Sequence, residues 1–370
     1  MTVSSISENS TNGPLLKLET GLYQSLTRSP SERKVLQIRL PEMLQQERLM
    51  RKFGDLMRIN IEHTLHWQDQ TLPIYSLTLG NAQKDKPTLL LTAGMHGIER
   101  IGSQVLIAWL QSLCERLRWD HALKDSLQNI QMVVVPILNP VGMYNNTRSN
   151  GNHIDLNRNA PIDAEDRVPL LGGGHRISGV LPWYRGKKGT LMEAENLALE
   201  RLIQRQITNH PLAVVLDLHS GFGSRDRLWF PYAYRRKAIG NISSYMAIKL
   251  LWERSFPHHT YIFEPQSQQY LSHGDVWDYF YVQAKKTDCN FMPLTLEMGS
   301  WAWVKKRPQQ LFNVAGLFNP QTSHRQARVL RRHMQLLDFL MAACQNNRNW
   351  LPNAHQKTLL EQTANSIWYS

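Results

Sequence analysis

Short apolar runs bounded by polar turns predict buried β-strands in this chain. The run at 88–92 carries no charge and shows no alternation, as expected of a strand that is covered on both faces. Three further buried strands are expected at 130–138, 213–218 and 293–296. By contrast, residues 56–79 alternate in polarity, and 67–70 is a plausible hairpin turn within them.

Apolar residues at helical spacing predict helices between these strands. The expected helices cover 41–53, 102–117, 190–209, 239–252 and 322–344. The third would be opened by the capping box Thr190-x-x-Glu193. Strands that alternate with helices indicate a single-domain, three-layer α/β/α sandwich around a central mixed, mostly parallel sheet.

The domain organisation follows from the same pattern. Residues 1–33 are rich in Ser, Thr, Asn and Glu without periodicity, so we expect a flexible N-terminal tail. We expect one catalytic domain over 34–346 and a C-terminal extension over 347–370. Residues 139–189 show no convincing regular element, and loops of that length are often functional.

Composition narrows the class of protein. No stretch of the 370 residues approaches the roughly 20 apolar residues of a membrane span, and mean hydropathy is −0.40. Three dispersed cysteines and an N-terminus unlike a signal peptide favour a reducing, cytoplasmic location. The net charge is +12, with basic clusters at 235–237, 305–307 and 325–332. Without a nucleic-acid-binding motif, we interpret them as solvated surface and expect no nucleic-acid or membrane partner. The oligomeric state stays open.

Metal-ligating side chains occur where two of the predicted buried strands end. His96 and Glu99 follow the strand at 88–92 after a glycine, and His219 ends the strand at 213–218. The carboxyl ends of strands in an open α/β sheet are where catalytic groups gather. A catalytic zinc takes three ligands from His, Asp or Glu and keeps one position open. The pattern therefore predicts a zinc site.

A second group of polar residues follows the strand at 130–138. Arg148, Asp155, Asn157 and Arg158 lie close together in sequence. Guanidinium groups pair with carboxylates in bidentate fashion and stabilise developing negative charge. These residues suit a substrate that bears a carboxylate and a carbonyl. Glu297 ends the last buried strand, where a carboxylate is costly to bury without a role or a partner.

Taken in order, these motifs resemble the zinc carboxypeptidase family, in its short bacterial branch with the murein-peptide amidases. The resemblance covers roughly 54–343. The matching elements are Gly94-x-His96-x-x-Glu99, Asn139-Pro140-x-Gly142, Arg148, Asp155-Leu156-Asn157-Arg158-Asn159, Tyr184-x-Gly186, Glu193-x-Glu195, Leu218-His219-Ser220 and Glu297.

The resemblance implies a role for each site residue. One zinc ion per chain would be bound by the ligands His96, Glu99 and His219. Arg148 would polarise the scissile carbonyl and hold the oxyanion, and Asp155 would orient a ligand histidine.

Three further roles concern the substrate and the proton. The resemblance implies that Asn157 and Arg158 grip the substrate carboxylate and that Glu297 is the general base for a zinc-activated water. Tyr270, spaced with Gly274 and Asp278 as in the family, would be a mobile catalytic tyrosine. Its rivals nearby are Tyr261, Tyr279 and Tyr281.

The expected function is that of a metallopeptidase of carboxypeptidase type, hydrolysing an amide bond next to a residue with a free carboxylate. The substrate would be a peptide or an N-acyl amino acid. One alternative is a deacylase or amidohydrolase resembling aspartoacylase or succinylglutamate desuccinylase, and another is a metal-free binding protein on the same fold. Two features depart from the family: Ala160-Pro161 after Asn159, and Trp277 near the pocket for the terminal side chain. Trp277 would either narrow that pocket or belong to a loop with a different course.

Overall fold

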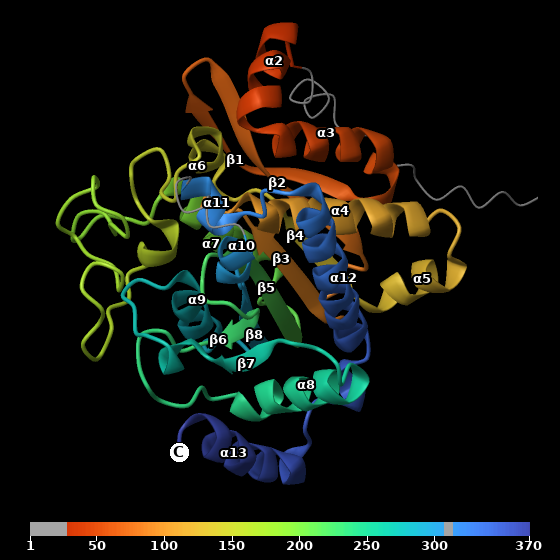
Figure 1. The fold of residues 1–370 in the computed structure, drawn as a ribbon. Coiled ribbons are helices and arrows are strands. Elements are labelled where there is room, and N and C mark those ends of the chain that lie inside the picture. Colours follow the sequence, from red (N-terminus) through yellow and green to blue (C-terminus); the bar gives the residue numbers. More distant parts are fainter. Residues whose placement is uncertain (1–27, 307–313) are drawn as a thin grey trace, which may run out of the picture.

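One eight-stranded sheet runs through the computed structural model, which describes residues 28–306 and 314–370 (Figure 1). In sheet order the strands are β1 (Arg58–Trp67), β2 (Gln70–Gly80), β4 (Gln131–Val135), β3 (Thr88–Ala93), β5 (Leu212–Ser220), β8 (Asn290–Met298), β6 (Arg227–Phe230) and β7 (Ile262–Pro265). The central strands β4, β3, β5 and β8 are parallel, whereas β2 and β6 join them antiparallel. The sheet is therefore mixed with a parallel centre, as predicted.

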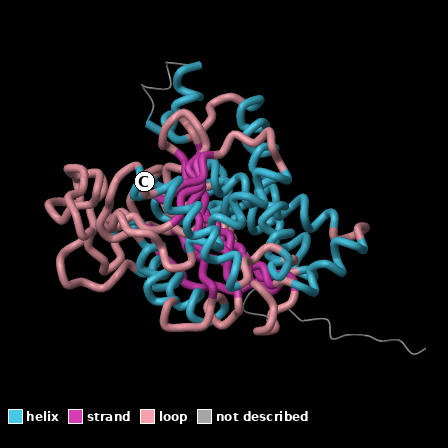
Figure 2. The backbone as a smooth tube through the Cα atoms, turned by 90° about the horizontal axis from the view of Figure 1, so that it is seen from below, coloured by secondary structure: helices cyan, strands magenta, loops and turns pink. Residues whose placement is uncertain are grey.

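Twelve α-helices are described beside this sheet. They are α2 (Pro30–Arg39), α3 (Pro41–Phe53), α4 (Arg100–Arg116), α5 (His121–Ser126), α6 (Pro140–Asn145), α7 (Ala194–Gln206), α8 (Ile242–Ser255), α9 (Val276–Ala284), α10 (Trp301–Lys306), α11 (Val314–Phe318), α12 (Ser323–Gln345) and α13 (Ala354–Trp368). Helices lie on both sides of the strands (Figure 2). Among the residues described, no helix is both long and apolar enough to cross a membrane.

The two faces of β5 show how the layers position the site. Leu218 points to the face that α4 covers, because a Cβ on Gly102 would lie 3.1 Å from the Leu218 Cβ. Helix α12 packs on the same strands, β3 and β5. Since side chains alternate along a strand, Asp217 and His219 point to the opposite face. There Trp277 of α9 contacts Asp217, so α9 belongs to the third layer of the predicted sandwich.

Two predicted boundaries are wrong. Helix α2 begins at Pro30, inside the expected tail, because Ser29 and Glu32 form a capping box and Leu36 is buried. What was expected of residues 1–27 lies outside the described residues. Helix α7 begins at Ala194 rather than near Thr190. The Thr190 hydroxyl donates to the Lys187 carbonyl instead of capping a helix.

The C-terminal extension folds as helix α13, next to α8 (Figure 1). Trp368 anchors it in the core and is 3% exposed. Its indole N–H donates to the Phe263 carbonyl at 3.0 Å, and its ring meets that of Phe230 edge-on. The last residues are thus integrated into the main hydrophobic core.

Candidate active site

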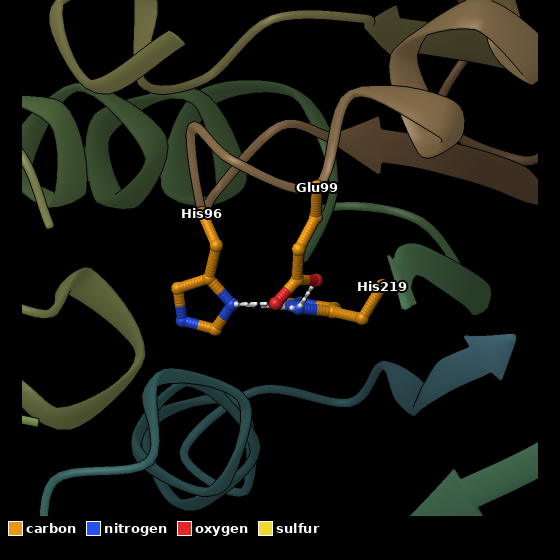
Figure 3. A group of neighbouring side chains, drawn as sticks. All are labelled: His96, Glu99 and His219. Atoms are coloured by element: carbon orange, nitrogen blue, oxygen red, sulfur yellow. Dashed lines mark hydrogen bonds and ion pairs between the residues drawn. The ribbon is translucent and has the colours of Figure 1, made fainter. Parts of the chain in front are cut away.

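His96, Glu99 and His219 converge at the carboxyl edge of the sheet (Figure 3). The first two lie in the turn between β3 and α4, and His219 lies near the end of β5. Because β3 and β5 are parallel neighbours, their carboxyl ends reach the same edge. One ligand atom from each residue lies within 4.8 Å of the other two. The three predicted ligands are therefore brought together.

A close backbone contact shapes the turn that carries two of these ligands. A Cβ on Gly97 would lie 2.0 Å from the Gly142 carbonyl carbon in α6. Only glycine leaves room for α6 at this point. The turn is closed by the Glu99 N–H, which donates to the His96 carbonyl at 3.0 Å. Both side chains are then directed to one point.

The two imidazoles present matching nitrogens to that point. His96 Nδ1 lies 3.2 Å from His219 Nδ1 and 2.9 Å from Glu99 Oε1, and His219 Nδ1 lies 3.2 Å from Glu99 Oε2. The outer nitrogens face carboxylates instead: His96 Nε2 lies 3.0 Å from Asp155 Oδ1, and His219 Nε2 lies 2.7 Å from Asp217 Oδ2.

These contacts test whether the site fits a cation. Asp155 and Asp217 are ionised carboxylates that can only accept hydrogen bonds, so each Nε2 donates its proton to them, and a ring in its neutral form then keeps a lone pair on Nδ1 for a cation. Two lone pairs and a carboxylate then face one another. A cation at their centre resolves this repulsion, and two nitrogens with one carboxylate suit Zn²⁺. The donor set fits zinc.

Electrostatics keep the carboxylates of Glu99 and Asp155 ionised. Burial alone would raise the pKa of Glu99, but the His96 and His219 imidazoles outweigh it and hold that pKa well below its ordinary value. Burial also acts against Asp155, whose pKa is lowered mainly by the charge of Arg148. For His219, burial would lower the pKa, yet the charge of Asp217 raises it well above the usual range. The same carboxylates favour a positive charge between the rings.

Arg148 reaches the same cluster. Its Nε donates to Asp155 Oδ2 at 2.8 Å and its Nη1 to Glu99 Oε1 at 3.2 Å. The side chain is 23% exposed, so it borders both the buried cluster and the solvent. Asp155 thus holds Arg148 with one oxygen and His96 with the other.

Glu297 lies beside the candidate metal ligands and has no polar partner among the described residues. It is paired in register with His219 across β5 and β8, which places both side chains on one face. Its carboxylate forms no hydrogen bond or ion pair with any residue that the structure describes. Burial raises its pKa to about 7, with a further rise from Glu99, although His219 and Arg148 act in the opposite direction. It is the carboxyl group of the site that is poised to exchange a proton near neutral pH.

Arg158 is the buried cation of the site. It is 2% exposed and forms no ion pair with any described residue. Its Nη1 donates to the Asn157 carbonyl at 3.0 Å and its Nη2 lies 3.3 Å from the Tyr270 hydroxyl. Its Nε and the Asn157 Oδ1 are buried without a hydrogen-bond partner. A buried guanidinium without an anion is costly, so this arrangement calls for an anionic ligand.

The sequence matches the family model described as zinc carboxypeptidase over residues 50–307. The chain belongs to the zinc carboxypeptidase family. Carboxypeptidase SOL1 of Arabidopsis thaliana is 29% identical over 76 residues, which span 20% of this chain and only 16% of that protein.

Solved structures share the fold. A thrombin-activatable fibrinolysis inhibitor is similar with a TM-score of 0.60 and 16% identity, covering 81% of this chain and 72% of its own. The bovine protein of that name, solved in complex with tick carboxypeptidase inhibitor, gives a TM-score of 0.59 and 19% identity, covering 83% of this chain and 97% of its own. At these identities the likeness concerns the carboxypeptidase-like fold.

Among the candidate tyrosines of this zinc carboxypeptidase family member, Tyr270 is the one beside Arg158. The hydroxyls of the three rivals are engaged elsewhere. Tyr261 contacts His333, Tyr279 donates to Glu200, and Tyr281 accepts from the Gly240 N–H.

Asp217 holds the candidate ligand His219 and is itself held by Trp277, a role that was not predicted from the sequence for either residue. The indole N–H of Trp277 donates to Asp217 Oδ2 at 2.8 Å, and Thr92 Oγ1 donates to Asp217 Oδ1 at 2.8 Å. Trp277 is 2% exposed. Its indole therefore supports the partner of His219. One signal was available: Asp217 lies two residues before His219 on a strand, so both share a face.

Arg185 also went unnoticed in the sequence, and it fixes the base of the long loop at 160–189. Its Nε donates to the Arg158 carbonyl at 2.9 Å, and its Nη1 and Nη2 bond Asp163 and the Ile162 carbonyl. Gly274 packs on the same carbonyl, where a Cβ would lie 1.9 Å from the Arg158 oxygen. The backbone of Arg158 is therefore clamped from two sides.

Proposed function

We propose that the chain is a zinc-dependent metallopeptidase of carboxypeptidase type, which hydrolyses an amide bond next to a residue with a free carboxylate. The observation that carries this proposal is the buried Arg158 guanidinium, which has no ion-pair partner among the described residues and shares its site with a metal-ligand triad. A substrate carboxylate supplies the missing anion. Membership in the zinc carboxypeptidase family supports the reaction type.

His96, Glu99 and His219 would hold one Zn²⁺ per chain. When bound, zinc supplies Lewis acidity, which polarises a carbonyl and lowers the pKa of a water molecule. Asp155 and Asp217 fix the imidazole orientations through the Nε2 protons. Such outer partners also raise the basicity of the ligand nitrogens.

Glu297 is the proposed general base. With a pKa of about 7, its carboxylate can accept a proton from the attacking water and return it to the leaving amine. Its freedom from hydrogen bonds to the described residues leaves both oxygens available. Arg148 lies across the cluster and would stabilise the oxyanion as negative charge develops on the carbonyl oxygen.

Substrate binding is assigned to Arg158, Asn157 and Tyr270. Arg158 and Asn157 present unpaired polar atoms at the buried end of the site. The ring of Tyr270 packs against those of Phe222 and Trp229, and its hydroxyl lies near Arg158. A carboxylate that binds the guanidinium would therefore also meet this hydroxyl.

A matched substrate panel tests the proposal. N-blocked dipeptides are assayed with a free and with an amidated C-terminus, beside N-acyl amino acids, using the wild type, Glu297→Gln and the surface control Glu165→Gln. We expect about one zinc per chain in all three proteins, and cleavage of free-carboxylate peptides by the wild type and the control only.

Each other outcome has a clear meaning. Equal cleavage of amidated and free peptides would refute the role of Arg158. Cleavage of N-acyl amino acids but of no peptide would replace the proposal by the deacylase alternative, which relies on the same arginine. Failure to bind zinc would favour a metal-free binding protein. Activity of Glu297→Gln above a few per cent of the wild type would remove Glu297 as the base.

A further inference from the structure

A cavity of about 350 Å³ lies at the start of helix α12, and none of the candidate metal ligands lines it. Its wall includes Ser224, Trp303, His324, Arg325, Arg328 and Arg332. The three arginines follow one another at spacings of three and four residues. Residues so spaced share one face of a helix, so the guanidinium groups line the same side of the cavity.

The charge of this arginine pocket is not compensated by its own wall. No carboxylate of a described residue lines it. Arg328 forms no ion pair within the described part of the chain, and Arg325 donates to the Trp303 carbonyl. Of the three arginines, only Arg332 forms an ion pair with a described residue: its Nη1 lies 2.7 Å from Asp226 Oδ2. Asp226 does not line the pocket.

The positive charge of the pocket lies at the start of helix α12, where basic side chains are unfavourable. The first turn of α12 contains no acidic residue, whereas His324 and Arg325 stand in it. The start of a helix carries a partial positive charge and favours anions. Another cavity of the molecule shows the usual balance, since Lys285 and Lys357 line it together with Asp288 and Glu361.

The arginine pocket adjoins the segments that leave the active-site strands. Ser224 lies shortly after the end of β5, which carries His219, and Trp303 lies shortly after the end of β8, which carries Glu297. The two segments are joined by the Trp301 N–H, which donates to the Gly223 carbonyl at 3.0 Å.

We propose that the arginine pocket is a binding site for a ligand with a diphosphate group. Guanidinium forks match phosphate oxygens in bidentate geometry. From Arg325 to Arg328, the two arginines without an acidic partner among the described residues, the helix rises by roughly 4.5 Å at 1.5 Å per residue, so their positive charge is spread over more than the width of a single carboxylate. An anion with two adjacent charged groups can pair with both of these guanidinium groups at once. The diphosphate is either free or attached to a substrate of the nearby active site.

Calorimetric titration of the full chain with inorganic pyrophosphate tests this inference. Arg328→Gln and Arg325→Gln should each weaken binding roughly tenfold, because hydrogen bonds between charged groups are lost. Arg331→Gln is the matched control, as it removes the same charge from the same helix without lining the pocket. It should bind within about twofold of the wild type. Binding should also weaken steeply with added salt.

Several results would overturn the inference. Pyrophosphate that binds equally to Arg328→Gln and the wild type is held elsewhere, for instance by the metal. An equal loss in Arg331→Gln would indicate a diffuse effect of net charge. Thermal unfolding of all variants checks that the fold is intact. Pyrophosphate binding is also measured on Glu297→Gln, which is expected to lack peptidase activity. The binding result can therefore be judged separately from the proposed peptidase function.

A kinetic arm distinguishes the two sources of the diphosphate. Saturating pyrophosphate is added to the hydrolysis of an N-blocked dipeptide that has a free C-terminal carboxylate and uncharged side chains. A changed kcat or KM that is lost in Arg328→Gln supports a free diphosphate ligand. Unchanged kinetics with binding intact support a diphosphate carried by a larger substrate. Both outcomes require the Arg328-dependent binding.

Discussion

Replacement of Asp217 by Asn should weaken zinc binding without altering any metal ligand. Asp217 is 0% exposed and accepts three hydrogen bonds, from Thr92, His219 and Trp277. Asparagine keeps the shape of the side chain but exchanges one oxygen for an amide group that only donates. The Thr92 hydroxyl can turn and accept, whereas the His219 and Trp277 nitrogens must donate. The amide oxygen of Asp217→Asn will therefore take the Oδ2 position.

The orientation of the Asp217→Asn amide determines how much zinc affinity is lost. The hydrogen bond to His219 persists, but the negative charge that makes the imidazole a stronger ligand is gone. Loss of such an outer partner typically weakens metal affinity by about 10- to 100-fold, or about 1.4 to 3 kcal/mol. Thr92→Val is the matched control, because it removes a partner of Oδ1 and leaves the charge in place. It should lower the stability of the fold but leave zinc affinity within about threefold of the wild type.

Competition with a chromogenic zinc chelator measures this directly. We expect the order wild type, Thr92→Val, Asp217→Asn from tight to weak. If Asp217→Asn binds zinc within about threefold of the wild type, Asp217 does not support His219 as argued. If Thr92→Val loses as much affinity as Asp217→Asn, the effect comes from packing rather than charge.

Three further predictions concern the substrate, pH and the C-terminal helix. Arg158→Gln should lower kcat/KM for free-carboxylate peptides by at least roughly tenfold, through the loss of charged hydrogen bonds, and leave amidated peptides unchanged; steady-state kinetics would contradict this if both fell together. Burial lowers the pKa of His333 to about 4 in the folded chain. Between pH 6.5 and 4 the unfolded chain therefore binds more protons than the folded chain. The free energy of unfolding should decrease by up to about 3 kcal/mol as the pH is lowered through this range. Denaturant unfolding of the wild type and His333→Gln should show this slope in the wild type and a clearly smaller one in the variant, and equal slopes would refute it. Trp368→Ala should destabilise the chain by about 3 to 5 kcal/mol, and a loss under 1 kcal/mol by denaturant titration would mean that α13 is not anchored in the core.

The centre of the fold could be read from the sequence because its strands are covered on both faces. The run at 88–92 corresponds to β3 (Thr88–Ala93). The helix at 41–53 matches α3 (Pro41–Phe53), whose first residue is a proline suited to a helix start. In such segments the local pattern and the tertiary environment favour the same structure.

Elements that depend on distant partners were not predicted. Strands β6 (Arg227–Phe230) and β7 (Ile262–Pro265) have four residues each, too few for a pattern, and exist by pairing with each other and with β8. Helix α9 (Val276–Ala284) is rich in aromatic residues that favour strands. Its start is set by Asp275, whose carboxylate accepts from the N–H groups of Trp277 and Asp278.

The same distinction applies to the site. The candidate metal ligands could be predicted because they lie at or just after the carboxyl ends of two strands, which meet at one edge of the sheet. Trp277 could not be placed, since its contact with Asp217 spans 60 residues of sequence. Arg185 lies in a loop without periodicity and contacts a backbone oxygen, for which residue identity gives no signal.

The distribution of formal charge in the site suits both parts of the proposal, a bound metal and an anionic substrate. With neutral imidazoles, the three carboxylates Glu99, Asp155 and Asp217 are balanced only by the charge of Arg148, which contacts the first two, so a formal charge of minus two remains around the proposed metal position. A divalent cation cancels it. Arg158 contributes to this balance only at a distance: its charge helps to lower the pKa of Asp155, but it forms no ion pair with a described residue. Its charge therefore remains for the substrate carboxylate. Glu297, with a pKa of about 7, can gain or lose a proton near neutrality without disturbing either pairing.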